Sequence, residues 1–231
     1  MKKGLLSFIL CTMFGIGTAA CAEPQCMDAA FPAAARPAKA GAGQSSTVQN
    51  PADWRLVLVN AAHPVGDFTP PELITLRNGV RVDARIYPDL QQMFDDMRAE
   101  GLSPIAGEGF RTFDEQCEMM CGRIREYRRK GYSRTESESM ARAYVAEPGT
   151  SEHQLGLAVD INSENGDHQS VYEWLAARAH EYGFILRYPQ GGESVTGYAY
   201  EPWHYRYVGR EAAQEITGSG MTLEEYLGAD D

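Results

Sequence analysis

The sequence predicts an α+β fold: a single small domain with a central, largely antiparallel sheet flanked by helices. Two observations favour this class over a doubly wound α/β fold. Strand signals do not alternate regularly with helix signals, and an early Asn78-Gly79 turn joins two short strand signals into a hairpin. Parallel strands need a long crossover between them, usually a helix, so this irregular order favours antiparallel pairing.

The composition is that of an ordinary globular protein. Of the 231 residues, 43% are hydrophobic, and 21 Lys and Arg stand against 32 Asp and Glu, a formal net charge of −11. Proteins that bind nucleic acid normally carry a basic surface, so this balance argues against a nucleic-acid partner.

Residues 1–22 have the three parts of a secretory signal peptide. Lys2 and Lys3 precede an apolar run from Leu5 to Ile16, and small residues follow up to Ala22. The run is shorter than the ~20 residues of a membrane-spanning helix, and no later stretch approaches that length. We therefore expect a bacterial protein that is exported, extracellular or associated with the cell envelope, without a transmembrane segment.

Two processing sites are open at the end of this segment. Cleavage after Ala22 would leave no lipid, whereas cleavage before Cys21 would expose a cysteine that bacteria can acylate. Thr18 stands where lipoprotein signals usually carry Leu, so the first alternative is favoured. Residues 23–50 contain 13 Ala, Pro or Gly among 28, which predicts a linker that does not fold alone. Residues 51–231 then form one domain, which we expect to be monomeric.

Alternation and capping signals predict the elements of this domain. Strands are expected at residues 54–60, 73–77, 80–85, 104–106, 157–162, 184–187 and 203–208. Helices are expected at residues 88–100, 113–130, 134–146 and 171–183, the last three after capping boxes that begin at Thr112, Ser133 and Ser170. Cys117 and Cys121 fall on the apolar face of one helix, where we expect them to be buried; side chains one turn apart are poorly placed for a disulfide.

Two of these strands, expected at residues 157–162 and 203–208, carry polar residues on one face. In the first of them Asp160 lies on the same face as Ala158 and Asn162, and in the second His204 lies with Arg206. Polar residues on a strand face are usually just solvated, so this alternation alone indicates only that the sheet has a face available for function.

A histidine upstream turns this face into a candidate metal site. His153 precedes Asp160 by seven residues in a turn-rich stretch that could place its imidazole over the sheet. Two His and one Asp form a ligand set for zinc with a fourth position open. Glu201, three residues before His204, could take a proton from a water whose pKa the metal lowers. The other three histidines, His63, His168 and His180, have no partner at ligand spacing.

The two blocks that contain these residues make a joint pattern. The first is SEHQLGLAVD at residues 151–160, of the form SxHxxGxAxD, and the second is EPWHYRY at residues 201–207, of the form ExWHxxY. Together they resemble the VanY-type zinc D,D- and L,D-carboxypeptidases, which trim D-alanine from peptidoglycan stem peptides. The resemblance includes GFRT at residues 109–112 and spans most of residues 54–210.

The resemblance implies a role for each matching residue and a Hedgehog/D,D-peptidase-like fold, in agreement with the fold class predicted above. Seven residues match positions of known role: the zinc ligands His153, Asp160 and His204, the catalytic base Glu201, Arg111 facing the scissile carbonyl, and Ser151 and Gln116 lining the substrate site. A guanidinium beside that carbonyl would stabilise the tetrahedral oxyanion.

The sequence therefore predicts a Zn²⁺-dependent carboxypeptidase that removes a terminal D-amino acid from peptidoglycan stem peptides during cell-wall remodelling. It does not decide between D,D and L,D specificity, that is, between pentapeptide and tetrapeptide substrates. Two alternatives stay open: an endopeptidase that cuts inside the stem or cross-bridge, and a non-catalytic, zinc-stabilised wall-binding domain. A binding domain has no need for a base three residues from a ligand, so Glu201 argues against the latter.

Overall fold

The computed structural model describes residues 53–65 and 68–229. The predicted signal peptide, the linker and both processing sites lie outside these residues. In the part of the chain that is described, no helix is long and apolar enough to cross a membrane.

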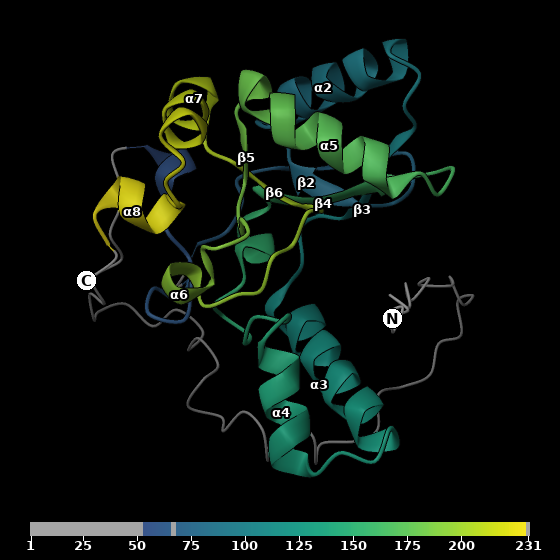
Figure 1. Ribbon diagram of the computed structural model, residues 1–231, viewed down its shortest axis with the longest axis vertical. Coiled ribbons are helices and arrows are strands. Elements are labelled where there is room, and N and C mark those ends of the chain that lie inside the picture. Colours follow the sequence, from purple (N-terminus) through teal and green to yellow (C-terminus); the bar gives the residue numbers. More distant parts are fainter. Residues whose placement is uncertain (1–52, 66–67, 230–231) are drawn as a thin grey trace, which may run out of the picture.

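A four-stranded sheet forms the centre of the fold (Figure 1). Its strands are β3 (Pro104–Glu108), β4 (Ala158–Ser163), β6 (His204–Tyr207) and β5 (Phe184–Leu186), in this spatial order. Every neighbouring pair is antiparallel. The predicted fold class and these four strands are confirmed.

The predicted hairpin is also present, as a separate two-stranded sheet. β1 (Leu73–Thr75) pairs antiparallel with β2 (Arg81–Asp83). Gly79 in the turn has φ +88°, a left-handed conformation that a glycine adopts without steric cost. The Asn-Gly signal therefore located the turn correctly.

Helices cover the sheet on one face and at its edge (Figure 1). The α-helices are α2 (Tyr87–Ala99), α3 (Phe113–Arg129), α4 (Arg134–Arg142), α5 (His168–Arg178), α6 (Glu193–Thr196), α7 (Arg210–Ser219) and α8 (Leu223–Leu227). Three short 3-10 helices are η2 (Trp54–Leu56), η3 (Glu152–Leu155) and η4 (Ala179–Tyr182). α2 and α5 pack over the sheet, α7 packs against β5, and α3 and α4 pack together as a hairpin that projects from the body.

The expected strand at residues 54–60 is wrong. Its first part is the 3-10 helix η2, and no strand follows. The carbonyl oxygens of Arg55 and Val57 accept hydrogen bonds of 3.0 and 2.8 Å from the guanidinium of Arg206. A buried side chain thus supplies the hydrogen bonds that a neighbouring strand would otherwise supply, and sequence alternation does not reveal this exchange.

Two helix boundaries also differ from expectation. α5 begins before Ser170, because the side chain of Asp167 is the N-cap and accepts a hydrogen bond of 3.3 Å from the Ser170 backbone N–H. α4 ends at Arg142 rather than near Ala146, whose carbonyl accepts a hydrogen bond from the side chain of Gln116. The capping boxes of Thr112 and Ser133 are confirmed.

The main hydrophobic core lies between the sheet and the helices α2 and α5. Val159 and Ile161 of β4 point into it, as do Tyr205 and Tyr207 of β6. Because side chains alternate along a strand, the residues between them face the other side of the sheet. That other side is the face on which the sequence predicts a site.

We expect Ile161→Ala to lower the free energy of unfolding by about 2–5 kcal/mol, because the side chain is fully buried and its removal leaves a cavity. Urea denaturation of the metal-free protein measures this change. Tyr144→Ala is the matched control, since that side chain is 51% exposed and its loss should change stability by about 0.5 kcal/mol or less. Equal losses in the two variants would contradict the assignment of the core.

Candidate metal centre

The register of two strands brings Asp160 and His204 together. In the antiparallel ladder of β4 and β6, these two residues are direct partners. Directly opposed residues lie only about 4.5–5.5 Å apart at Cα, with side chains on the same face. The Nδ1 atom of His204 accordingly lies 3.1 Å from Oδ1 of Asp160.

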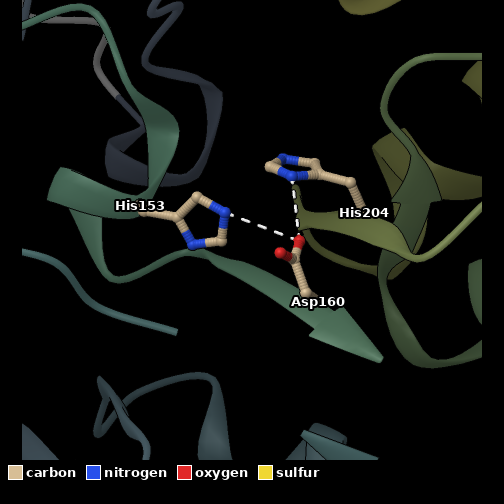
Figure 2. Close-up of side chains that lie close together, drawn as sticks. All are labelled: His153, Asp160 and His204. Carbon is tan, nitrogen blue, oxygen red and sulfur yellow. Dashed lines mark ion pairs between the residues drawn. The ribbon is translucent and has the colours of Figure 1, made fainter. Parts of the chain in front are cut away.

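The third member comes from the 3-10 helix η3, which ends at Gly156 with φ +71°. This turn places Nε2 of His153 at 3.5 Å from Oδ1 of Asp160 (Figure 2). The rings of His153 and His204 meet edge to face, 4.9 Å apart at their centroids. The three ligand atoms lie within 4.8 Å of one another, and no other such group occurs among the described residues.

Contacts on the far sides of the two rings indicate which tautomer each adopts when it is neutral, as a metal ligand must be. Nδ1 of His153 lies 2.8 Å from the carbonyl oxygen of Gly109, so this nitrogen carries the proton. Nε2 of His204 faces Oε2 of Glu152 at 3.5 Å, so we assign the proton of the neutral ring to this nitrogen. In these neutral forms, the remaining nitrogen of each ring has a lone pair and faces Asp160.

This geometry fits a metal ion. Oδ1 of Asp160 is buried and makes no hydrogen bond to the described residues, although two imidazole nitrogens face it. Lone pairs that converge in a buried place repel one another unless a cation lies between them. Two imidazoles and one carboxylate with an open fourth position are the ligand set of a catalytic zinc site.

Gly109 allows the backbone to reach His153. A Cβ atom at this position would overlap the carbonyl oxygen of Arg81 in β2. Only glycine therefore lets this segment pass close enough to β2 for its own carbonyl to accept from the imidazole. This explains physically why the GFRT segment begins with glycine.

The charges in the centre act on each other strongly in the metal-free protein. Burial alone would lower the pKa of His204, but the carboxylates of Asp160 and Glu152, at 3.1 and 3.5 Å from its ring nitrogens, raise it to about 9. Burial alone would raise the pKa of Asp160, but His153 and His204 hold it well below its usual range. Asp160 is thus a carboxylate at neutral pH, as a metal ligand must be.

Glu201 lies beside this cluster at the entrance to β6. Its carboxylate is 5% exposed, and Oε2 lies 3.8 Å from Nδ1 of His204. Burial raises the pKa of Glu201 to about 7; the positive charges of His204 and Arg111 oppose the rise, and Asp160 adds to it. A carboxyl group with this pKa can both accept and return a proton near neutral pH.

Gln116, one of the two residues predicted to line the substrate site, holds Arg111 in place. Nη1 of Arg111 donates a hydrogen bond of 2.6 Å to Oε1 of Gln116, whose Nε2 donates one of 2.7 Å to the carbonyl of Ala146. Nη2 of Arg111 lies 3.5 Å from the half-exposed Glu108. Its Nε is buried and has no hydrogen-bond partner among the described residues, so one guanidinium donor is free for another acceptor.

The other predicted residues fall as follows. Ser151 is buried at the start of η3, two residues before His153. His63 contacts Asn60, and His168 accepts from the backbone of Ser163; neither belongs to the group of candidate ligands. Cys117 and Cys121 are buried in α3 as expected.

Sequence reasoning missed a set of buried charges behind the histidines. Glu152 precedes His153 directly, and its carboxylate contacts the guanidinium groups of Arg187 and Arg206. One feature of the sequence could have indicated these buried charges: Arg206 lies two residues after His204 and therefore on the same strand face. Nothing in the sequence pointed to Glu152 as its partner, because their contact depends on how η3 packs against β6.

The family model VanY, D-alanyl-D-alanine carboxypeptidase, matches residues 79–210. The chain belongs to this family. A D-alanyl-D-alanine carboxypeptidase of Enterococcus faecalis is 49% identical over 178 residues, which are 76% of this chain and 66% of that protein. The bifunctional D-Ala-D-Ala dipeptidase and carboxypeptidase VanXYC of Enterococcus gallinarum is 33% identical over 184 residues, 74% of this chain and 92% of that protein.

Solved structures of VanY relatives share the fold. A variant of the vancomycin-resistance D,D-pentapeptidase VanY, in complex with Zn(II), has a TM-score of 0.73 at 49% identity and covers 76% of this chain and 99% of its own. The LD-carboxypeptidase LdcB has a TM-score of 0.64 at 31% identity, covering 77% of this chain and 88% of its own. The family predicted from the two sequence blocks is confirmed.

Affinity for Zn²⁺ should rise with pH well beyond the ordinary range of a histidine. With a pKa of about 9, His204 is protonated at pH 7 in the metal-free protein, and a metal must displace that proton. We expect about a tenfold gain in affinity per pH unit between about pH 7 and pH 8.5, measured by competition with a chelator. A plateau above pH 7 would contradict the coupling of His204 to the two carboxylates, and His63→Gln should leave the slope unchanged.

Proposed function

We propose that this chain is a zinc-dependent carboxypeptidase that hydrolyses the terminal D-Ala–D-Ala bond of peptidoglycan stem peptides. One observation carries the proposal: a buried carboxyl group, Glu201, with a pKa of about 7 lies 3.8 Å from a ligand atom of the candidate metal centre. Membership of the VanY family supports the same activity.

Zinc would be held by His153, Asp160 and His204. The chemistry of this donor set and the unpaired oxygen of Asp160 support this choice of metal. When bound, zinc supplies a Lewis acid that polarises the scissile carbonyl and lowers the pKa of a water molecule to about 7.

Glu201 would move the proton. Its pKa matches that of the activated water, so it can accept the proton of the attacking water and give it to the departing amine of D-alanine. The backbone N–H of Glu201 donates a hydrogen bond of 3.2 Å to the carbonyl of Tyr188, which anchors the residue at the edge of the cluster. A buried and anchored base loses little freedom when the substrate binds.

Arg111 would stabilise the oxyanion that develops on the carbonyl oxygen. Gln116 occupies one side of the guanidinium and leaves Nε free, so the donor is oriented before substrate binds. The role of Gln116 would therefore be to position Arg111. Ser151, buried at the start of η3 two residues before His153, would line the substrate site.

The relatives favour D,D over L,D specificity. The D,D-pentapeptidase VanY is 49% identical to this chain, whereas the LD-carboxypeptidases LdcB and DacB are 31% and 32% identical. A structure of VanYB in complex with D-alanine-D-alanine is 48% identical. We therefore place a pentapeptide stem, which ends in D-Ala-D-Ala, as the substrate.

Such a substrate lies outside the cytoplasmic membrane. We propose that residues 1–22 direct export and are removed. Residues 23–50 would then form an N-terminal linker that precedes the domain. Cleavage after Ala22 remains the favoured route, and mass spectrometry of the exported protein distinguishes it from acylation at Cys21.

The purified protein should release D-alanine from a synthetic pentapeptide stem and release much less from a tetrapeptide stem. Treatment with EDTA should abolish release, and Zn²⁺ should restore it. Enzymatic detection of free D-alanine measures both rates. Release of larger fragments without free D-alanine would identify an endopeptidase instead, and bound zinc with no cleavage at all would indicate a wall-binding role.

Glu201→Gln should lower kcat by at least about 10²-fold, because the amide cannot accept the proton. Zn²⁺ affinity should change by only a few fold, since Glu201 is not among the three ligands. Steady-state kinetics and chelator competition on the same preparation test both expectations. Loss of zinc and of activity together would mean that Glu201 acts as a ligand rather than as the base.

A further inference from the structure

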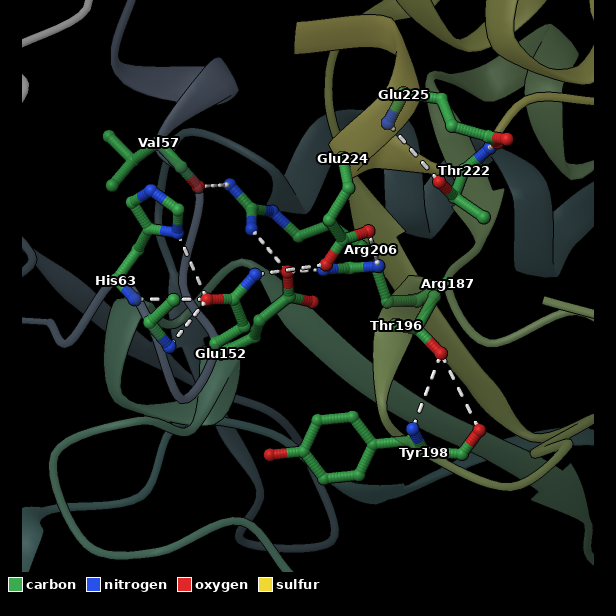
Figure 3. A network of polar contacts seen from close by, with 12 residues as sticks. Val57, His63, Glu152, Arg187, Thr196, Tyr198, Arg206, Thr222, Glu224 and Glu225 are labelled. Carbon is green, nitrogen blue, oxygen red and sulfur yellow. Dashed lines mark hydrogen bonds and ion pairs between the residues drawn. The ribbon is translucent and has the colours of Figure 1, made fainter. Parts of the chain in front are cut away.

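Four buried charges form a network, shown in Figure 3, that reaches His204 through Glu152. Two are guanidinium groups and two are carboxylates, so the network is neutral as a whole. Its members are Glu152, Arg187, Arg206 and Glu224, and each side chain is at most 2% exposed. Charges buried this deeply are tolerated only when they are paired, so the position of each depends on the others.

The two oxygens of Glu152 have different surroundings. Oε1 accepts hydrogen bonds of 2.7 Å from Nε of Arg187 and 2.8 Å from Nη1 of Arg206. Oε2 is buried and accepts no hydrogen bond from the described residues; it lies 3.5 Å from Nε2 of His204, which is likewise buried without a hydrogen-bond partner. Because neither atom has another partner among the described residues, we take Nε2 of His204 as the donor that faces Oε2 of Glu152.

Arg187 connects this pair to the end of the chain. Its Nη1 and Nη2 donate hydrogen bonds of 2.8 and 2.6 Å to the two carboxylate oxygens of Glu224, in the C-terminal helix α8. Asn60 donates a further hydrogen bond of 3.1 Å to Glu224 from the N-terminal segment. Glu224 and Asn60 both lie outside residues 79–210, the part that the family model matches.

The network keeps Glu152 charged. Its Oε1 accepts hydrogen bonds from the guanidinium groups of Arg187 and Arg206, and two positive charges in contact favour the carboxylate form. A carboxylate only accepts hydrogen bonds, so Oε2 requires the proton of His204 to be on Nε2. The lone pair of His204 is then on Nδ1, the atom that lies 3.1 Å from Asp160.

We propose that Glu152 is a positioning residue that fixes the tautomer and orientation of His204 for metal binding, and that helix α8 completes this function through Glu224 and Arg187. The inference deepens the proposed function, since it rests on His204 being a zinc ligand. It makes metal affinity depend on the C-terminal helix, which contains none of the three ligands.

Three variants of the full chain test this dependence. Glu224→Gln removes one charge of the network while keeping the size of the side chain. Arg187→Lys keeps the charge, but a single ammonium group cannot reproduce the planar fork that joins Glu152 to Glu224. Glu225→Gln is the matched control: Glu225 is the exposed neighbour in α8, and its carboxylate belongs to the capping box with Thr222 rather than to the network.

The measurements are the dissociation constant of Zn²⁺ by chelator competition and the visible absorption spectrum of the Co²⁺-substituted protein. We expect Glu224→Gln and Arg187→Lys each to weaken Zn²⁺ binding by about tenfold or more and to alter the Co²⁺ spectrum. Glu225→Gln should bind Zn²⁺ within about twofold of the wild type, with an unchanged spectrum, because Gln can also close the capping box with Thr222. Circular dichroism of the metal-free proteins shows whether each variant is folded.

Several results would overturn the proposal. Wild-type affinity in both network variants would do so, and so would equal losses in Glu224→Gln and Glu225→Gln, which would mean that α8 matters only as packing. A measurement on the wild type holds even where a variant fails to fold: nitrogen-15 NMR of the zinc-loaded protein should show a proton on Nε2 of His204. A metal-bound, unprotonated Nε2 would refute the inference.

These outcomes are distinct from failure of the proposed function. If wild-type protein binds no Zn²⁺, the metal centre itself is wrong. If it binds Zn²⁺ and releases D-alanine while the network variants behave as the wild type does, only the role of Glu152 and α8 is wrong.

Discussion

The register between β4 and β6 is the constraint on which the rest of the site depends. It sets Asp160 directly opposite His204, so that a carboxylate and an imidazole share one face of the sheet at a fixed separation. A shift of one strand by one residue would turn its ligand side chain into the hydrophobic core and separate the pair. That shift is prevented by Val159 and Tyr205 on the opposite face, which are 0% and 1% exposed in the packed core. The same hydrophobic burial that stabilises the fold therefore fixes the geometry of the metal ligands.

Around this pair, buried polar groups fall into two kinds. Behind His204, the arginines and glutamates satisfy one another almost completely, and the network is neutral. In front of it, Oδ1 of Asp160 and Nε of Arg111 are buried without hydrogen-bond partners among the described residues. Native proteins leave few buried polar atoms unpaired, and under the proposed function metal and substrate would supply the interactions that these two atoms lack. The paired charges behind His204 help to hold the groups in front of it in place.

Two features that the sequence did not predict share one physical origin. Residues 54–60 alternate like a strand, yet their carbonyls bind the side chain of Arg206 rather than another backbone. Glu152 attracted no attention beside His153, because its partners Arg187 and Arg206 are distant in sequence. In both cases the partner is a buried arginine supplied by tertiary packing. Local patterns report which face of an element is apolar, but they do not report which side chain will meet a backbone or a carboxylate there.

The sequence by itself determined the fold class, the strands of the central sheet, the capped helices and the seven residues proposed for the site. Alternation, capping and motif spacing are local properties, and they are written in neighbouring residues. Tertiary structure alone decided which nitrogen of each histidine faces Asp160, how burial raises the pKa of Glu201 to about 7, and that Glu224 reaches Glu152 through Arg187. These features depend on distances and on the exclusion of water between segments far apart in the chain, and no local pattern encodes them.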